Sequence, residues 1–127
     1  MPKIPKPTQA ELAILRVLWQ RGPSTVRQVQ DGLVHGAAVG YTTILKLLQI
    51  MTEKGLVARD VVPRTHIYSA GVSEQTTQKN LVSDLLERAF GGSSLGLVQQ
   101  ALAAKRLSPE ELEQIQAWID SHKGGEA

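Results

Sequence analysis

The sequence predicts a mainly α-helical fold in two parts, the first of which also contains a β-hairpin. Three observations support this prediction. Apolar residues recur at helical spacing after Thr8, after Thr25 and over residues 41–54. Residues 56–69 alternate roughly between apolar and polar side chains on both sides of a short turn, as two paired strands do. Helical spacing then returns in three segments of the remaining chain.

The composition is ordinary for a soluble globular protein, with 42% hydrophobic and 20% charged residues in a chain of 127. No apolar run approaches the ~18 residues of a membrane-spanning helix, so membrane insertion is not expected. The first residues contain no hydrophobic signal segment, and we therefore expect a cytoplasmic protein. Because cysteine is absent, disulfides and thiolate metal sites are excluded.

The first two helices are predicted from their starting signals. Thr8 and Glu11 have the spacing of a capping box, in which each side chain bonds the backbone of the other residue. Gly22 and Pro23 are typical of a helix end. Thr25 and Gln28 form a second capping box, which predicts a shorter helix.

The helix predicted over residues 41–54 has two different faces. Its apolar face is expected to pack on the core, and it carries Ile44, Leu47, Leu48 and Met51. The opposite face carries mainly hydroxyl, amide and charged groups: Thr42, Lys46, Gln49, Ile50 and Glu53. Such groups suit base edges and phosphates in a DNA major groove. The alternative is an ordinary surface helix over a core.

The predicted hairpin follows this helix directly and is basic. Three helices followed by a basic hairpin form a winged helix, a helix-turn-helix variant whose third helix enters the major groove. Arg59, Arg64 and His66 would then contact phosphates or the minor groove, although solvated hairpin charges are the simpler interpretation. Residues 1–70 contain nine Lys or Arg and four Asp or Glu, whereas residues 71–127 contain five and eight. This asymmetry favours polyanion binding by the first region.

Several motifs in this order resemble the penicillinase-repressor family of bacterial transcriptional regulators. They are LxxLW at 15–19, YTT at 41–43, EKGLV at 53–57, and the RxxxxR wing from Arg59 to Arg64 followed by Tyr68. The resemblance implies a winged-helix repressor that acts as a homodimer on palindromic operators. It also implies that Thr42, Thr43 and Lys46 contact the operator from the recognition helix, and Arg64 from the wing. Many members have arginine where this chain has Ile50, which leaves the preferred operator sequence open.

Residues 71–127 are expected to form a helical dimerisation domain beside the winged helix of residues 1–70. Their helices carry apolar seams that a second copy would bury. The predicted seam residues are Val82, Leu85, Leu86, Phe90, Leu95, Val98, Leu102, Leu112, Ile115 and Ile119. The alternative is that these helices fold back on the winged helix of the same chain.

The resemblance also implies a membrane sensor or protease that relieves repression. Antibiotic-responsive members are cut at an Asn-Phe bond, but the aligned pair here is Gln100-Ala101. No cofactor is predicted, because His35, His66 and His122 lie in unrelated elements and do not have metal-ligand spacing. No catalytic constellation is present either, so an enzyme is not expected.

The sequence therefore predicts a homodimeric repressor that binds a palindromic operator in double-stranded DNA through helix 41–54 and wing 57–69. The residues predicted to contact DNA are Arg27, Tyr41, Thr42, Thr43, Lys46, Gln49, Arg59, Arg64 and His66. The main alternative is a winged-helix protein-interaction module without sequence-specific DNA binding. A sensor with a small-molecule pocket between the two regions is a third possibility, although few aromatic residues are available to line such a pocket.

Overall fold

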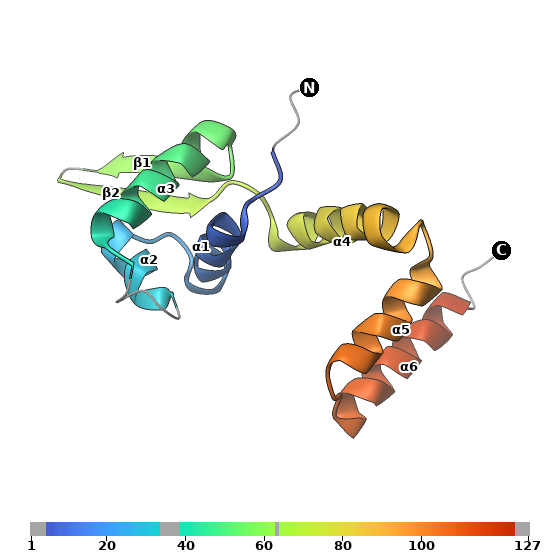
Figure 1. Cartoon of the computed structure of the whole chain (residues 1–127). Coiled ribbons are helices and arrows are strands. Elements are labelled where there is room, and N and C mark those ends of the chain that lie inside the picture. Colours follow the sequence, from blue (N-terminus) through green and yellow to red (C-terminus); the bar gives the residue numbers. More distant parts are fainter. Residues whose placement is uncertain (1–4, 34–38, 63, 124–127) are drawn as a thin grey trace. The chain divides into compact units, whose positions relative to one another are not determined.

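The computed structural model describes residues 5–33, 39–62 and 64–123, so His35 lies outside the described residues. The chain forms two compact units, residues 1–82 and 83–127. The elements follow the predicted order (Figure 1). They are α1 (Gln9–Arg21), α2 (Val26–Gly32), α3 (Tyr41–Lys54), β1 (Val57–Val62), β2 (Thr65–Ala70), α4 (Glu74–Phe90), α5 (Ser94–Ala104) and α6 (Pro109–Lys123). The unit boundary lies within α4, whereas the predicted domain boundary at residue 70 stays a prediction.

The predicted capping boxes start α1 and α2. The Thr8 hydroxyl accepts the Glu11 amide proton at 3.2 Å, and the Glu11 carboxylate accepts the Thr8 amide proton at 2.9 Å. Thr25 and Gln28 repeat this arrangement at α2. These bonds satisfy amides that a helix start otherwise leaves unpaired. At the end of α1, Gly22 has a φ of +89°, which glycine adopts without a Cβ clash.

The hairpin covers one side of the first unit. Val57 pairs with Ala70 and Val62 with Thr65, whereas the sequence predicts strands over 56–61 and 66–69, so each strand extends one residue closer to the turn than predicted. A further pairing has no signal in the sequence: Ser24 bridges Tyr68 with two backbone hydrogen bonds of 2.8 and 2.9 Å. This bridge attaches the α1–α2 turn to the edge of the hairpin.

The core of the first unit lies between the three helices and the hairpin. As predicted, α3 directs Ile44, Leu48 and Met51 into it, while Leu47 is half-buried. The other core members come from every neighbouring element: Ile14, Leu15, Leu18, Val26, Val29, Leu56, Val57 and Tyr68. Because one face of α3 is packed in this core, the opposite face has a fixed orientation relative to the rest of the first unit.

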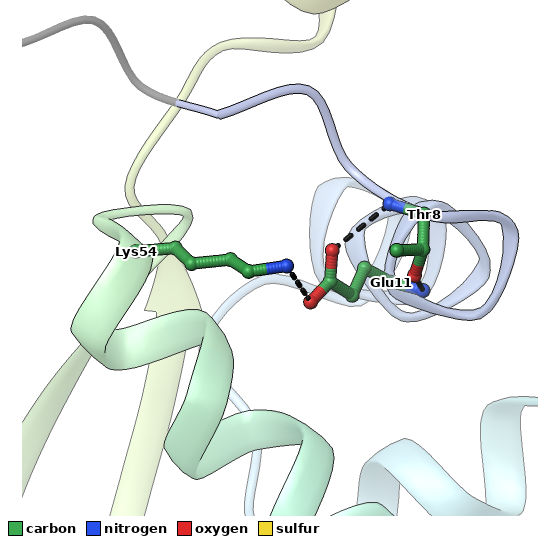
Figure 2. A network of polar contacts seen from close by, with 3 residues as sticks. All are labelled: Thr8, Glu11 and Lys54. Carbon is green, nitrogen blue, oxygen red and sulfur yellow. Dashed lines mark hydrogen bonds and ion pairs between the residues drawn. The ribbon is translucent and has the colours of Figure 1, made fainter.

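A buried ion pair joins the start of α1 to the end of α3 (Figure 2). The Lys54 ammonium lies 2.8 Å from the Glu11 carboxylate, whose side chain is 3% exposed. Burial raises the pKa of Glu11, but the hydrogen bonds from Lys54 and from Thr8, together with the Lys54 charge, outweigh burial and lower the pKa below its ordinary value. The last turn of α3 is thereby held to α1 by charge as well as by packing.

The chain leaves the hairpin through a tightly held junction. The Trp19 indole donates a 3.0 Å hydrogen bond to the Val72 carbonyl, and the Gly71 amide donates to the Leu56 carbonyl at 2.8 Å. A Cβ atom on Gly71 would lie only 2.8 Å from the Gly55 carbonyl oxygen, so a larger residue cannot enter without displacing backbone. Thr77 in α4 is also buried. The first turns of α4 are therefore fixed to the first unit.

The second unit exposes most of its apolar side chains. Ser93 caps α5, and Ser108 with Glu111 forms the predicted capping box at α6. Neither α5 nor α6 contains a buried residue. Leu97 and Ile115 on these two helices are half-buried, whereas the exposed large apolar side chains range from 41% for Leu102 to 70% for Leu95. In the described part of the chain, no helix is long and apolar enough to cross a membrane.

Candidate nucleic-acid interface

The outward face of α3 presents the polar groups that the sequence indicated. Thr42, Lys46 and Gln49 are exposed, whereas Ile50 at the edge of this face is half-buried. Thr43 is also exposed, although helical geometry places it about 100° around the axis from Thr42. Since the opposite face of α3 packs in the core, these side chains project from a rigid support.

A groove of about 730 Å³ lies between the start of α2, α3 and the end of the hairpin, and is called here the hairpin groove. It brings together five of the residues predicted to contact DNA, from segments far apart in the sequence. These are Arg27, Tyr41, Gln49, Arg64 and His66. Thr42, Thr43, Lys46 and Arg59 do not line the groove.

The electrostatic character of this surface is cationic. None of the described residues that line the hairpin groove is acidic. Within the described ranges, Arg27, Lys46 and Arg64 form no ion pair, so their charges remain available to an external anion. Arg59 is exposed on β1. Cations without internal partners are the groups that bind nucleic-acid phosphates.

Arg64 occupies an unusual backbone conformation at the tip of the hairpin. Its φ is +71°, and it is the only described non-glycine residue with a positive φ. Glycine or asparagine is the usual residue at such a position, because a Cβ atom makes it strained. A long cation kept at a strained turn is consistent with a functional role for its guanidinium.

Several residues of the groove were not predicted from the sequence. Thr25 was assigned only to capping, while Leu45, Val61 and Thr65 received no role, yet all four line the groove. The missing information was tertiary, since the hairpin had to be placed beside α3. The exposed Val61 could have been noticed as an apolar residue near the end of a short strand.

A second hollow, of about 460 Å³, lies on the other side of α3. Its described lining is mainly small and aliphatic, including Ala13, Val17 and Leu47, with Arg16 among the polar residues. These residues all belong to the first unit, so this hollow is not the pocket between two regions that the sensor hypothesis requires. In the described ranges, no group of three or more metal-ligating side chains is present.

The family model, the related sequences and the solved structure that this chain resembles all belong to repressors or transcriptional regulators. The sequence model of a family described as "Penicillinase repressor" matches residues 7–121. The penicillinase repressor of Bacillus licheniformis is 24% identical over 123 residues, which cover 97% of this chain and 96% of that protein. The transcriptional regulator BlaI of Mycobacterium tuberculosis is 32% identical over 95 residues, covering 74% and 69%. The solution structure of the DNA-binding domain of the repressor BlaI matches 58% of this chain and 90% of that domain, with 26% identity and a TM-score of 0.50.

Proposed function

The chain belongs to the penicillinase repressor family, and on this premise we propose that it is a homodimeric transcriptional repressor that binds a palindromic operator in DNA. Family membership confirms the resemblance read from the sequence motifs. The structural match to a repressor DNA-binding domain confirms the winged-helix fold. The named relatives are a repressor and a transcriptional regulator, members of a non-enzymatic family, which confirms that the chain is not an enzyme.

The observation that carries the proposal is the set of unpaired cations around the outward face of α3. In our proposal, Thr42, Lys46 and Gln49 lie in the major groove, where amides and cations read base edges. Arg27 and Arg64, which both line the hairpin groove, hold phosphates beside this helix, and Arg59 and His66 add to the wing contact. Tyr41 and Thr43 contribute from the first turn of α3.

The exposed apolar seams of the second unit support the dimer. Leu95, Val98 and Leu102 recur on one side of α5, and α6 adds Leu112 and Ile119. Leaving such side chains in water is unfavourable, while a second copy would cover them. A two-fold dimer presents two recognition helices, which matches two half-sites of opposite direction.

The test is an anisotropy titration of the protein against duplexes from its own upstream region and against random DNA, over a series of salt concentrations. We expect saturable binding to one upstream duplex at two chains per site. Lys46→Ala should weaken that binding roughly tenfold and lower the salt slope by about one unit. Lys79→Ala, which removes an exposed cation of α4, is the matched control and should change neither quantity.

The protein-interaction module remains the second candidate function, and the same titration distinguishes it. Such a module would bind every duplex weakly and equally, and Lys46→Ala would then act no differently from Lys79→Ala. That outcome would remove base reading from the proposal, while leaving the cationic surface available to an acidic protein partner.

The variant Arg64→Gly separates the contribution of Arg64 to DNA binding from its effect on folding stability. Glycine relieves the positive φ, so we expect the free energy of unfolding to rise by about 0.5–1 kcal/mol. The same variant loses a phosphate contact, so the salt slope of DNA binding should fall by about one unit. Thermal unfolding and salt-dependent titration of the same preparation measure both effects. An unchanged slope would show that Arg64 does not contact DNA.

The family resemblance also implies that a membrane sensor or protease relieves repression, and we place this event in the cytoplasm. The peptide bond between Gln100 and Ala101 lies inside α5. A protease would have to unwind this helix, since cleavage favours exposed irregular segments over regular helices. We therefore propose that any inducing cleavage of this chain occurs elsewhere.

A further inference from the structure

The hairpin groove contains apolar side chains that folding leaves in water. Val61 is 63% exposed and Tyr41 is 47% exposed, while Leu45, which also lines the groove, is half-buried. These three residues are called here the apolar strip. In the same groove lie Arg27 and Arg64, neither of which has an ion-pair partner among the described residues. The groove therefore combines unpaired cations with exposed apolar surface.

The strand register places Val61 on the face of β1 that continues from the core, and next to the turn Val62 and Thr65 line the groove from the other face. Side chains alternate between the two faces of a strand, so Val57 and Val61 of β1 share one face. Directly paired residues of antiparallel strands also share a face, which adds His66 opposite Val61. Val57 is buried on the core, so the same face continues past the core to Val61. Asp60 lies on the other face, paired with Ile67, and its negative charge is directed away from this side.

We infer that the hairpin groove seats one sugar–phosphate strand of duplex DNA, with its deoxyribose rings on the apolar strip. This inference rests on the proposed function and adds an energetic role for residues that carry no charge. A nucleic-acid strand alternates anionic phosphates with sugars whose C–H edges are largely apolar. Arg27 and Arg64 match the phosphates, and the apolar strip matches the sugars between them. A peptide segment composed of acidic residues alone would use the cations but would not cover Val61 and Tyr41.

Contact with the sugar has a signature that distinguishes it from phosphate and base contacts. It releases no counterion, so its loss leaves the salt slope unchanged. It also carries no sequence information, so its loss weakens all duplexes by the same factor. A contact with the thymine methyl group would instead disappear on duplexes that contain only G·C pairs.

The experiment uses Val61→Thr, which replaces one methyl group by a hydroxyl and keeps the β-branched shape that strands favour. The probes are duplexes of about 20 base pairs, two helical turns. One comes from the protein's own upstream region, one contains only A·T pairs and one only G·C pairs. We expect binding to all three to weaken by a common factor of about 3 to 10, with unchanged salt slopes. Ile67→Thr, on the opposite face of the hairpin, is the control and should bind as the wild type does.

Each result decides the inference. Wild-type affinity of a folded Val61→Thr protein would overturn it, as would a loss confined to the A·T duplex, which would indicate a methyl contact. If Ile67→Thr lost as much DNA affinity as Val61→Thr, the loss would come from a less stable hairpin and the inference would be overturned. The unfolding midpoints of both variants measure that stability directly. If the wild type binds no duplex at all, the proposed function itself fails. That outcome is distinguishable from a failure of the sugar contact alone.

Discussion

Leu102→Asp should convert the protein into a monomer that binds its operator at least ~100-fold more weakly than the wild type. Leu102 lies on the apolar side of α5 and is 41% exposed. In the proposed dimer this side chain is covered by the partner, and a buried unpaired carboxylate is strongly unfavourable there. Without dimerisation the two half-sites are bound independently, so the gain from linked binding is lost. Sedimentation and anisotropy titration measure the two effects.

Gln100→Asp is the matched control for this variant. It introduces the same charge into the same helix, but helical spacing places residue 100 on the opposite side of α5 from Leu102. We expect a dimer with normal operator affinity. If Leu102→Asp remained dimeric while folded, the seam assigned to α5 would be wrong. If it became monomeric without loss of affinity, dimerisation would not contribute to operator binding.

Lys54→Met should lower the free energy of unfolding by about 2 kcal/mol. The substitution keeps much of the aliphatic side chain but leaves the Glu11 carboxylate buried without its ammonium partner. The full cost of breaking a buried pair is larger, but Lys54 is 29% exposed, so water can replace part of the lost interaction. Denaturant titration at one fixed protein concentration measures the change, because dimerisation also affects apparent stability.

The loss caused by Lys54→Met should shrink as the solution is acidified. In the wild type the pKa of Glu11 is lowered on folding, so the stability it contributes is complete above the ordinary carboxyl pKa of about 4.3 and is lost as pH falls through the lowered value. In the variant, the Lys54 interactions that lower the pKa of Glu11 are gone, so less stability depends on the ionisation of Glu11. Because acid removes the Glu11 charge that pairs with Lys54 in the wild type, the free energies of unfolding of the two proteins should approach each other as the pH falls below about 4.3.

Arg88→Met is the control for the ion pair. Arg88 and Asp84 lie 3.7 Å apart on α4, and the Arg88 side chain is 73% exposed. Exposed pairs contribute at most about 1 kcal/mol, so we expect a small change with little dependence on pH. Equal effects of the two substitutions would show that burial of Glu11 does not strengthen its pair with Lys54.

The sequence predicted the fold where local chemistry determines it. The capping boxes at Thr8, Thr25 and Ser108 each start a helix, because a side chain three residues away completes the bonds. The buried face of α3 followed from periodicity alone. Contacts between distant residues were not predictable in this way. Glu11 was read only as a cap, and its ion pair with Lys54, 43 residues away, requires the packing of α1 against α3.

In the candidate interface, too, local features were predictable from the sequence and contacts between distant residues were not. The polar face of α3 was visible as a pattern within one helix. The hairpin groove was not, since Arg27, Tyr41 and Arg64 meet only when α2, α3 and the hairpin are placed together. The strained φ of Arg64 also depends on the length of the turn, and the predicted turn over 62–65 is one residue too long at each end, because Val62 and Thr65 pair as strand residues. Neither the hairpin groove nor the positive φ of Arg64 can be predicted from one short stretch of the sequence.

The two tryptophans give each unit its own optical reporter. Trp19 is half-buried in the first unit, where its indole proton is bonded to Val72, whereas Trp118 is 64% exposed in the second. Indole emission shifts to shorter wavelengths when the ring leaves water. Association through α6 would therefore alter the emission of Trp118, while unfolding of the winged helix would alter that of Trp19. Trp118→Phe leaves Trp19 as the single indole, so comparison of this variant with the wild type separates the emission change caused by folding from the change caused by assembly.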